Sequence, residues 1–283
     1  MQSRYDVLAL RRCALAVSVC HDLDLFPDTD AVVLVGPPPV HASWQDCQRA
    51  LGDADPESHR GRARLARWLL ARRWVADRTA DQLVERARPV GMVVGAESHP
   101  GGGWARRRIL GGALELGLGF LGLDPARPDG VVIPADGVLA AAGIDSAGWW
   151  PAAMDYLERM GARATERWAR DPAAALRPMG DCDVVTLLGS ATLRSALAGG
   201  TAGGMRAIAV PMRTRGWLDL SRIDPAFALA AAAATEPAER GFDRPLLITA
   251  DEVVLPTPGG RPAEIVLRDP AVRSGELREA LYR

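Results

Sequence analysis

The stretch CALAVSVC, Cys13–Cys20, is a short apolar run, and the chain soon reaches a second one, AVVLV, Ala31–Val35. Neither run alternates between apolar and polar residues. Continuous runs of this kind are typical of strands that are covered on both faces of a parallel sheet. We therefore predict that Cys13–Cys20 forms the first strand of a central sheet and that Ala31–Val35 forms the next.

Similar apolar runs recur along the chain, and helical patterns separate them. Further strands are predicted at 90–95, 131–133, 184–188, 207–210 and 246–249, and helices at 44–51, 61–75, 79–88, 104–121, 151–170, 191–198 and 225–235. This alternation is typical of an α/β fold. The sequence thus predicts a largely parallel central sheet flanked by helices, in a single domain over 1–283, with the helix-rich stretch 136–177 as an insertion or cap.

Two segments need a separate interpretation. Leu246–Thr249 and Val253–Leu255 can form a hairpin instead, with Asp251 in the turn. The longest apolar stretch, Ile109–Leu123, contains Glu115 and several glycines, so it is too short and too interrupted for a membrane span. We interpret it as a buried helix.

The composition excludes several classes of chemistry. All 34 basic side chains are arginine, and the chain contains neither lysine nor asparagine. Without lysine there is no Schiff-base nucleophile, no pyridoxal phosphate anchor and no Walker A lysine. A GC-rich coding sequence explains both absences, because lysine and asparagine share A-rich codons; selection for a lysine-free surface is the alternative. Any anion that this protein binds must be held by arginine, backbone amides or a metal ion.

The overall charge indicates a soluble globular protein. The net charge is −1, whereas a nucleic-acid-binding domain is usually strongly basic, so nucleic acid is not an expected partner. Met1–Arg12 has no apolar core of the signal-peptide kind, and the four cysteines form no CxxC pair. We therefore expect a cytoplasmic protein with free thiols and no membrane association. The oligomeric state is not indicated.

Polar residues follow several of the predicted strands, at the carboxyl ends where ligand sites lie in parallel sheets. His21, Asp22 and Asp24 come directly after the first predicted strand. Imidazole and carboxylate groups can bind a divalent metal ion or transfer a proton near neutral pH. We predict all three as metal ligands, with a divalent metal as the candidate cofactor, and His21 and Asp22 also as catalytic residues. The alternative is that these aspartates cap backbone amides where the chain leaves the strand.

The most distinctive local string is ESHPGGGW, residues 97–104, between a predicted strand and a predicted helix. Glycines let the backbone approach a ligand closely, and a helix N-terminus favours an anion. An ordinary flexible loop is the alternative, since the string matches no nucleotide-binding motif. The string and the helix after it supply the catalytic candidates Glu97 and His99 and the substrate-binding candidates Gly101, Gly102, Gly103 and Arg106.

Three further residues are predicted to bind substrate. Ser190 follows a predicted strand and precedes a helix, although it can equally act as the helix N-cap. Arg213 and Arg215 flank Thr214 and can bind an acidic group with two guanidinium groups. Surface arginines without a ligand are the alternative for this pair.

The arginine-rich stretch Arg60–Arg73 combines a basic face with large apolar residues. Such a helix can bind nucleic acid or an anionic surface. More often it is a solvated face on which the arginine stems cover apolar neighbours.

These residues together predict an α/β enzyme, a hydrolase or group transferase that acts on a small phosphate- or carboxylate-bearing metabolite. The absence of a dinucleotide fingerprint argues against redox chemistry. The alternative is a non-catalytic ligand-binding or protein-interaction module in which the same arginines recognise an acidic partner.

Overall fold

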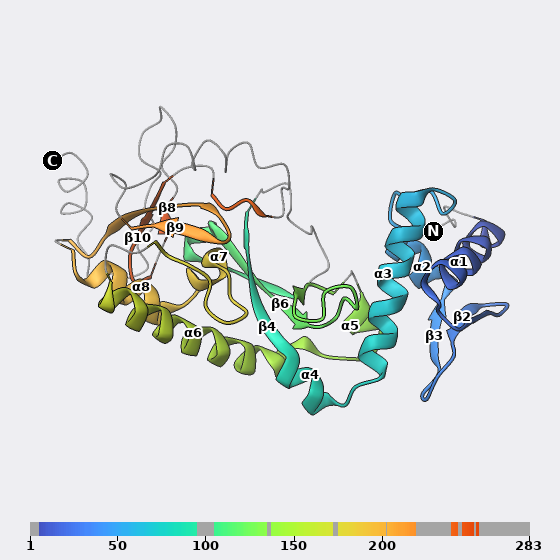
Figure 1. Cartoon of the computed structure of the whole chain (residues 1–283). Helices are drawn as coiled ribbons and strands as arrows, with labels where there is room; N and C mark the ends of the chain where they lie inside the picture. The colour runs from blue at the N-terminus through green and yellow to red at the C-terminus, as the bar shows by residue number, and fades with distance from the viewer. Residues whose placement is uncertain are drawn as a thin grey trace. The chain divides into compact units, whose positions relative to one another are not determined.

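A computed structural model of the chain describes residues 6–94, 105–134, 137–171, 175–201, 203–218, 239–242, 245–251 and 253–254 (Figure 1). The chain divides into two compact units. Unit 1 comprises Met1–Arg88, Pro100–Ala105 and Leu118–Ala153, and unit 2 comprises Pro89–His99, Arg106–Gly117 and Met154–Arg283.

Unit 1 combines helices with a small antiparallel sheet of strand order β1–β2–β3. Its elements are α1 (Val7–His21), β1 (Leu25–Pro27), β2 (Ala31–Leu34), β3 (Val40–Ser43), α2 (Trp44–Leu51), α3 (His59–Ala76), α4 (Ala80–Arg86), β7 (Val131–Val132), α5 (Val138–Ala141) and η2 (Ser146–Trp149). The hydroxyl groups of Ser43, Ser58 and Thr79 each accept a hydrogen bond from the backbone amide three residues further on. These caps fix where α2, α3 and α4 begin, because they satisfy amides that have no partner within the helix.

The core of unit 1 lies where α1 packs against α3. The side chains that α1 buries are those of Leu10, Cys13, Ala14 and Val17. Aromatic rings connect the segment 118–153 with α3. The ring centre of Phe120 lies 5.8 Å from that of Trp74 on α3. It lies 5.4 Å from that of Trp149, and these two rings meet edge to face. The helix α3 therefore has packed neighbours on more than one side.

The predicted strand Cys13–Cys20 is wrong, because this stretch is the greater part of α1. Ala14, Leu15 and Ala16 favour a helix, and the buried residues of α1 recur every three or four positions, which is the spacing of one helix face. Only Cys13, Ala14 and Val17 of this run are buried, on the side of α1 that packs against α3.

A second sheet has the order β4–β6–β5, with β7 also paired to β6. Its strands are β4 (Ala87–Val93), β5 (Arg106–Ile109) and β6 (Leu114–Leu121), and the short helix η1 (Leu110–Gly112) joins the last two. The buried helix predicted over Ile109–Leu123 is therefore wrong. Five glycines interrupt the run and weaken a helix, and every residue of β6 except Leu121 is buried.

Unit 2 contains a third sheet, of strand order β11–β10–β8–β9, and several helices. Its elements are most of α6 (Trp150–Arg170), then α7 (Val184–Leu187), α8 (Ala191–Gly199), β8 (Arg206–Met212), β9 (Arg215–Trp217), β10 (Leu246–Ile248) and β11 (Val253–Val254). The stretch 136–177 contains α5, η2 and α6, and the prediction of a single domain stays a prediction.

The predicted parallel sheet is wrong, because the strands form three small sheets and pair in the antiparallel sense throughout the described residues. Val184–Leu188, predicted as a strand, is mostly helix α7, which begins where the side chain of Asp183 accepts a hydrogen bond from the amide of Thr186 at 2.7 Å. The alternative hairpin is confirmed, because β10 and β11 pair in the antiparallel sense with Ile248 opposite Val253. The described strands form no carboxyl edge of a parallel sheet, so the predicted site residues are not gathered at such an edge.

Candidate functional site

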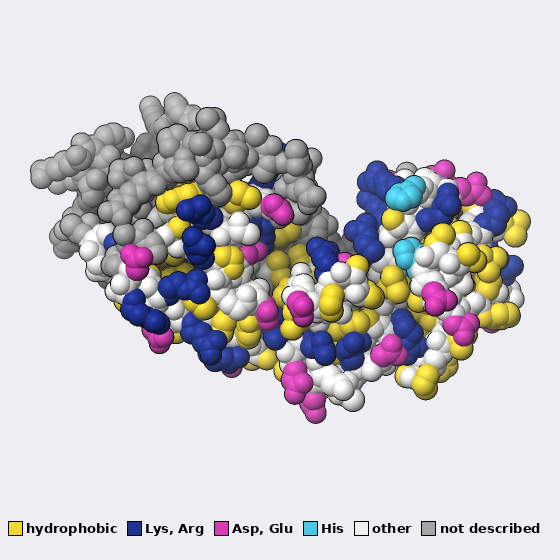
Figure 2. Space-filling model, in the orientation of Figure 1, with side chains coloured by type: hydrophobic (Ala, Val, Ile, Leu, Met, Phe, Trp, Pro, Cys, Tyr) yellow, Lys and Arg dark blue, Asp and Glu magenta, His cyan; other side chains and the backbone are white. Residues whose placement is uncertain are grey.

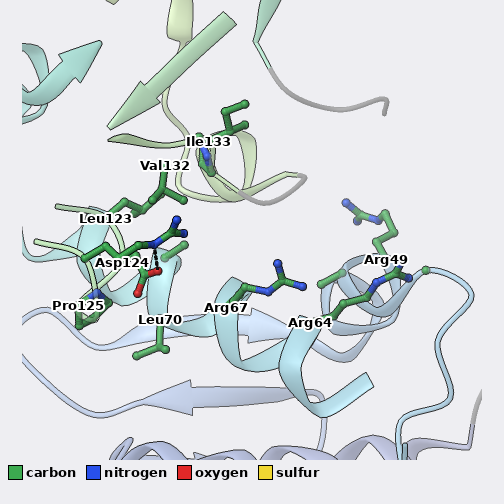
Figure 3. A pocket seen from close by; sticks show the side chains of 14 residues that line it. Arg49, Arg64, Arg67, Leu70, Leu123, Asp124, Pro125, Val132 and Ile133 are labelled. Carbon is green, nitrogen blue, oxygen red and sulfur yellow. Dashed lines mark hydrogen bonds and ion pairs between the residues drawn. The ribbon is translucent and has the colours of Figure 1, made fainter. Parts of the chain in front are cut away.

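A pocket of about 430 Å³ lies within unit 1, between α2, α3 and the segment 123–134 (Figure 3). This volume falls within the range of about 300–1,000 Å³ that is usual for small-molecule sites. Four arginines line it: Arg49 from α2, Arg64 and Arg67 from α3, and Arg127 from the segment. Asp124 supplies the lone carboxylate among the described lining residues.

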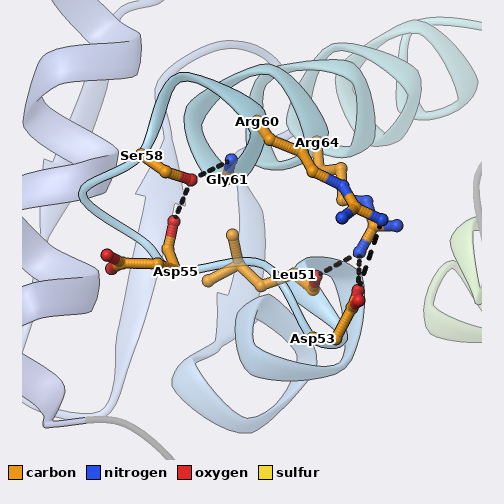
Figure 4. Close-up of polar contacts among 7 residues, drawn as sticks. All are labelled: Leu51, Asp53, Asp55, Ser58, Arg60, Gly61 and Arg64. Atoms are coloured by element: carbon orange, nitrogen blue, oxygen red, sulfur yellow. Dashed lines mark hydrogen bonds and ion pairs between the residues drawn. The ribbon is translucent and has the colours of Figure 1, made fainter.

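The beginning of α3 is fixed by close backbone contacts (Figure 4). The hydroxyl of Ser58 donates to the carbonyl of Asp55 at 2.6 Å and accepts from the amide of Gly61 at 2.9 Å. A Cβ at Gly61 would overlap the carbonyl oxygen of Asp55, so only glycine fits there without a backbone shift. This turn sets where α3 starts and therefore where its arginines lie.

The side chain of Arg64 is held in place by the end of α2. Its Nη1 donates to the carbonyl of Leu51 at 2.8 Å and to Oδ1 of Asp53 at 2.6 Å (Figure 4). Arg60, one helical turn before Arg64, lies 3.6 Å from the same Oδ1. The hydrogen bond from Arg64 lowers the pKa of Asp53.

Within the described residues, Arg49 and Arg67 use only some of their N–H donors. The Nε of Arg67 donates to the carbonyl of Ala63 at 3.3 Å, and among the described residues no carboxylate pairs with it. Arg49 contacts Asp46 through Nη2 at 2.7 Å. Because a guanidinium has several N–H donors in a planar fork, Arg49 and Arg67 retain the geometry that binds carboxylate or phosphate with two hydrogen bonds.

The opposite end of the pocket has an apolar wall beside one ion pair. In Figure 3 the guanidinium groups of Arg49, Arg64 and Arg67 lie toward one side of the space, and Leu123, Val132 and Ile133 lie toward the other. Near these apolar residues, Asp124 accepts a hydrogen bond from Nε of Arg127 at 3.1 Å. The pocket thus offers cationic donors at one end and an apolar wall at the other.

The predicted metal ligands lie elsewhere in unit 1, where α1 ends. His21 is in the last turn of α1, and Asp22 is the C-cap, with φ +50° and its amide bonded to the carbonyl of Ser18. His21, Asp22 and Asp24 are all exposed. In the part of the chain that the structure describes, no three His, Cys, Asp or Glu side chains are grouped so that they could hold a metal ion. None of the three lines the pocket.

The predicted catalytic residues Glu97 and His99 and the predicted glycines Gly101, Gly102 and Gly103 lie outside the described residues. Arg106, which follows them, is described: its Nε lies 2.7 Å from Oε2 of Glu115 on the neighbouring strand. Arg108 contacts the other oxygen of Glu115 at 2.9 Å. Two arginines therefore flank this buried carboxylate, and the role of Arg106 in binding substrate stays a prediction.

Ser190 is a helix N-cap, as the alternative interpretation held. Its hydroxyl accepts from the amide of Leu193 and donates to Oε2 of Glu158 at 2.8 Å. Glu158 also accepts from the amides of Ala191 and Thr192, so a carboxylate of the protein already lies at this helix N-terminus. Whether Ser190 also contacts a substrate stays a prediction.

Arg213 and Arg215 have partners within unit 2. Arg213 donates through Nε to Asp183 at 2.7 Å and through Nη2 to the carbonyl of Gly91 at 2.6 Å. The guanidinium of Arg215 lies 5.0 Å from the centre of the Trp217 ring. Their predicted substrate-binding role is neither confirmed nor contradicted.

Sequence reasoning noted the basic face of Arg60–Arg73 but did not assign a small-molecule site to it. The signal was present, because Arg60, Arg64 and Arg67 are four and then three residues apart and so share one face of a helix. Nothing in the sequence indicated that Arg49 and Arg127 would join them.

No protein-family model, no curated protein and no solved structure matches the chain. In the described residues, no helix combines the length and apolar character needed to cross a membrane. The functional argument therefore depends on the geometry of the pocket.

Proposed function

We propose that this protein binds a small anionic ligand, a phosphate or carboxylate that carries an apolar group, in the pocket of unit 1. One observation carries the proposal: Arg49, Arg64 and Arg67 line one side of a pocket whose single described carboxylate, Asp124, is already paired with Arg127. Converging cations in a concave site raise the local concentration of anions and bind them with charge-assisted hydrogen bonds.

The apolar wall selects among anions. Leu123, Val132 and Ile133 offer no hydrogen-bond donors to an inorganic anion, but they can cover an aromatic or aliphatic group. A ligand that fills both ends gains the charge-assisted bonds and the burial of apolar surface. The pocket therefore fits an amphipathic small molecule better than inorganic phosphate alone.

The lining favours binding over catalysis. Acid–base or nucleophilic chemistry needs a side chain that can take up a proton or attack the substrate. Among the described lining residues, Asp124 alone has such a group, and its carboxylate is held by Arg127 and by the amide of Ala126. A hydrolase or transferase remains a prediction that depends on the predicted catalytic residues His21, Asp22, Glu97 and His99.

Calorimetric titration of the full chain with phenyl phosphate, inorganic phosphate and benzyl alcohol tests the proposal. We expect phenyl phosphate to bind about tenfold more tightly than inorganic phosphate, because its ring buries apolar surface worth roughly 1.4 kcal/mol. Benzyl alcohol, which has the ring but no charge, is expected not to bind. Equal affinity for all three, or no binding of phenyl phosphate, would contradict the proposal.

Arg67→Gln and Arg62→Gln form a matched pair for this titration. Both remove one positive charge from α3, but Arg62 is not among the pocket residues and donates to the carbonyl of Glu57. We expect Arg67→Gln to weaken phenyl phosphate binding roughly tenfold, since a hydrogen bond to a charged group contributes about 1.5–3 kcal/mol. Arg62→Gln is expected to leave it within about twofold, because exposed charges at a distance are largely screened. Equal losses in both variants would mean that general charge and not the pocket attracts the anion.

A further inference from the structure

The guanidinium of Arg64 is fixed through one of its three nitrogen atoms. Its Nη1 donates both to the carbonyl of Leu51 at 2.8 Å and to Oδ1 of Asp53 at 2.6 Å (Figure 4). Gly52, between these two acceptors, has φ +60°, and a Cβ there would come within 3.3 Å of the same Nη1. A glycine turn at the end of α2 therefore holds one end of the Arg64 side chain.

The other two nitrogen atoms of Arg64 are left for a ligand. Among the described residues, no acceptor contacts its Nε or its Nη2. Arg64 lines the pocket but Leu51 and Asp53 do not, so Nη1 is directed to acceptors outside the lining. The N–H groups of Nε and Nη2 lie parallel on one edge of a guanidinium, and this edge can bind two oxygens of one anion. Arg64 is thus held ready for an oxyanion.

Two more arginines on the same side of the pocket are also held through one nitrogen each (Figure 3). Arg67 donates through Nε to the carbonyl of Ala63 at 3.3 Å, and Arg49 contacts Asp46 through Nη2 at 2.7 Å. Within the described residues, each of them keeps further N–H donors. Three guanidinium groups suit an anion with three terminal oxygens, as in a phosphate monoester, better than the two oxygens of a carboxylate.

The charges around these arginines leave an excess of two positive charges. Asp53 contacts both Arg64 and Arg60, so this group of three carries one positive charge. Arg67 adds a second, because no carboxylate contacts it among the described residues, and Arg49 adds none, because its carboxylate partner cancels it. In Figure 2, basic side chains lie over the upper part of α3. A phosphate monoester carries about −1.5 to −2 at neutral pH, whereas a carboxylate carries one negative charge.

We infer that the anionic group of the ligand is a phosphate monoester in its dianionic form, which Arg64 binds through Nε and Nη2. Arg49 and Arg67 supply further hydrogen bonds to the same group. The assignment rests on the proposed function, because it concerns the ligand of the same pocket. It narrows the ligand to a small phosphorylated compound with an apolar alcohol part and rejects carboxylates and singly charged oxyanions.

The charge of such a ligand changes in a pH range where the pocket keeps its own charge. A phosphate monoester loses its second proton near pH 6, whereas arginine and aspartate ordinarily do not titrate between about pH 5 and 8. The ionisable residues of the described lining and its ion pairs are Arg49, Arg60, Arg64, Arg67, Arg127, Asp46, Asp53 and Asp124. His59 begins α3 but is exposed and outside the lining, and its protonation at acidic pH would favour an anion. An affinity that rises with pH therefore reports the charge of the ligand.

Calorimetric titration of the full chain with phenyl phosphate and benzenesulfonate, at about pH 5 and about pH 7.5, tests the inference. Both compounds have a phenyl ring and three terminal oxygens, but benzenesulfonate keeps a single charge throughout. We expect phenyl phosphate to bind about tenfold more tightly at the higher pH, because its second charge strengthens the hydrogen bonds to arginine. The affinity for benzenesulfonate is expected to change less than about twofold. Benzoate, with two oxygens and one charge, is expected to bind about tenfold more weakly than phenyl phosphate at the higher pH.

Arg64→Lys and Arg60→Lys form a matched pair for the role of Arg64. Both substitutions keep the positive charge but remove the planar fork of donors. Both arginines contact Asp53, but only Arg64 lines the pocket. We expect Arg64→Lys to weaken phenyl phosphate binding about tenfold and Arg60→Lys to leave it within about twofold. Circular dichroism checks that both variants keep the native helix content.

Failure of the proposed function and failure of this assignment give different results. If phenyl phosphate does not bind the unsubstituted chain at either pH, the proposed function is itself wrong. If it binds with an affinity that does not depend on pH, or no more tightly than benzoate and benzenesulfonate, the pocket stands and the phosphate monoester is overturned. Equal losses in Arg64→Lys and Arg60→Lys overturn the role of Arg64. The titrations of the unsubstituted chain decide the ligand class even when a variant does not fold.

Discussion

Arginines in unit 2 and arginines at the pocket of unit 1 differ in what they bind. Arg194 is 6% exposed and donates to the carbonyls of Leu188 and Ala250, and burial lowers its pKa. Arg213 is held by a carboxylate and a carbonyl in the same unit. Arg67, by contrast, is exposed at a pocket and donates only to a carbonyl of its own helix among the described residues.

The hydrogen-bond partners of an arginine side chain, and not the number of arginines, indicate a ligand site. The buried arginines of unit 2 tie segments together, so we expect their removal to destabilise the protein. Among the pocket arginines, Arg67 has no carboxylate partner in the described residues, so we expect its removal to change binding and to leave stability almost unchanged. Four predictions test this contrast.

The largest expected effect is that of Arg213→Gln on stability. Arg213 is 12% exposed, and its loss removes the cationic partner of Asp183 and the hydrogen bond to the carbonyl of Gly91. Breaking such a pair costs about 3 kcal/mol of unfolding free energy. Urea denaturation measures this loss, with Arg67→Gln as the control, whose free energy of unfolding is expected to change by less than about 0.5 kcal/mol. Equal losses in the two variants would remove the contrast.

Gly61→Ala is expected to destabilise the protein by about 2 kcal/mol, because the added Cβ overlaps the carbonyl of Asp55 and the backbone must shift. Gly148→Ala is the control: Gly148 also lies in unit 1, but a Cβ there has no neighbour within 4 Å. Thermal unfolding of the two variants gives the comparison. A smaller loss for Gly61→Ala than for Gly148→Ala would mean that the start of α3 is not fixed as described.

Glu158→Gln is expected to cost about 1 kcal/mol at neutral pH. Burial alone raises the pKa of Glu158, but hydrogen bonds from Thr192, Ala191 and Ser190 lower it by more, so the net shift is downward. A carboxyl whose folded pKa is depressed stabilises the protein above its unfolded pKa and loses this contribution as the pH falls through the folded value. The stability difference between the unsubstituted chain and the variant should therefore shrink below about pH 4.5, the ordinary value for glutamate.

Urea titrations of both proteins at neutral pH and at several acidic values measure that difference. A difference that stays constant as the pH falls would show that the carboxylate charge of Glu158 does not stabilise the start of α8.

The smallest expected effect is that of Val132→Thr on ligand preference. This substitution places a hydroxyl in the apolar wall and is expected to weaken phenyl phosphate binding about threefold, close to the value of one buried methylene. The affinity for inorganic phosphate should not change, because that anion reaches only the arginine end. Val131→Thr is the control, since neighbouring side chains of a strand point to opposite faces and Val131 is not in the lining. Equal effects at both positions would contradict the proposed ligand orientation.

Local helix patterns could be predicted from the sequence. Trp44–Leu51 is helical with the predicted bounds, and the predicted helix 151–170 differs from α6 by one residue. Both begin at a clear signal, a serine N-cap in the first and Trp-Pro in the second. The hairpin around Asp251 was also visible, because it depends on residues close in the chain.

The direction of strand pairing could not be predicted. A continuous apolar run has no alternation that distinguishes a strand from a helix. The sequence therefore predicts strands at Cys13–Cys20 and Val184–Leu188, although the first stretch is helical and the second is mostly helical. Ile109–Leu123 was assigned to a helix for the same reason. Whether each run is a strand or a helix depends on the segment that packs against it, and the sequence of the run alone does not identify that segment.

The predicted position of the site depends on the predicted fold. His21 and Asp22 were placed at the carboxyl edge of a sheet, and that placement failed once their segment proved to be the end of α1. The spacing of Arg64 and Arg67 was readable because it lies within one helix. The meeting of Arg49 and Arg127 with them requires tertiary contacts that no local pattern encodes.

A crystal structure of the full chain with 4-bromophenyl phosphate tests the central claim most directly, because anomalous scattering locates the bromine without ambiguity. The account predicts the phosphate group within hydrogen-bond distance of Arg67 and Arg49 and the bromine against Leu123, Val132 and Ile133. A ligand bound elsewhere, or bound in this pocket in the reverse orientation, would contradict it.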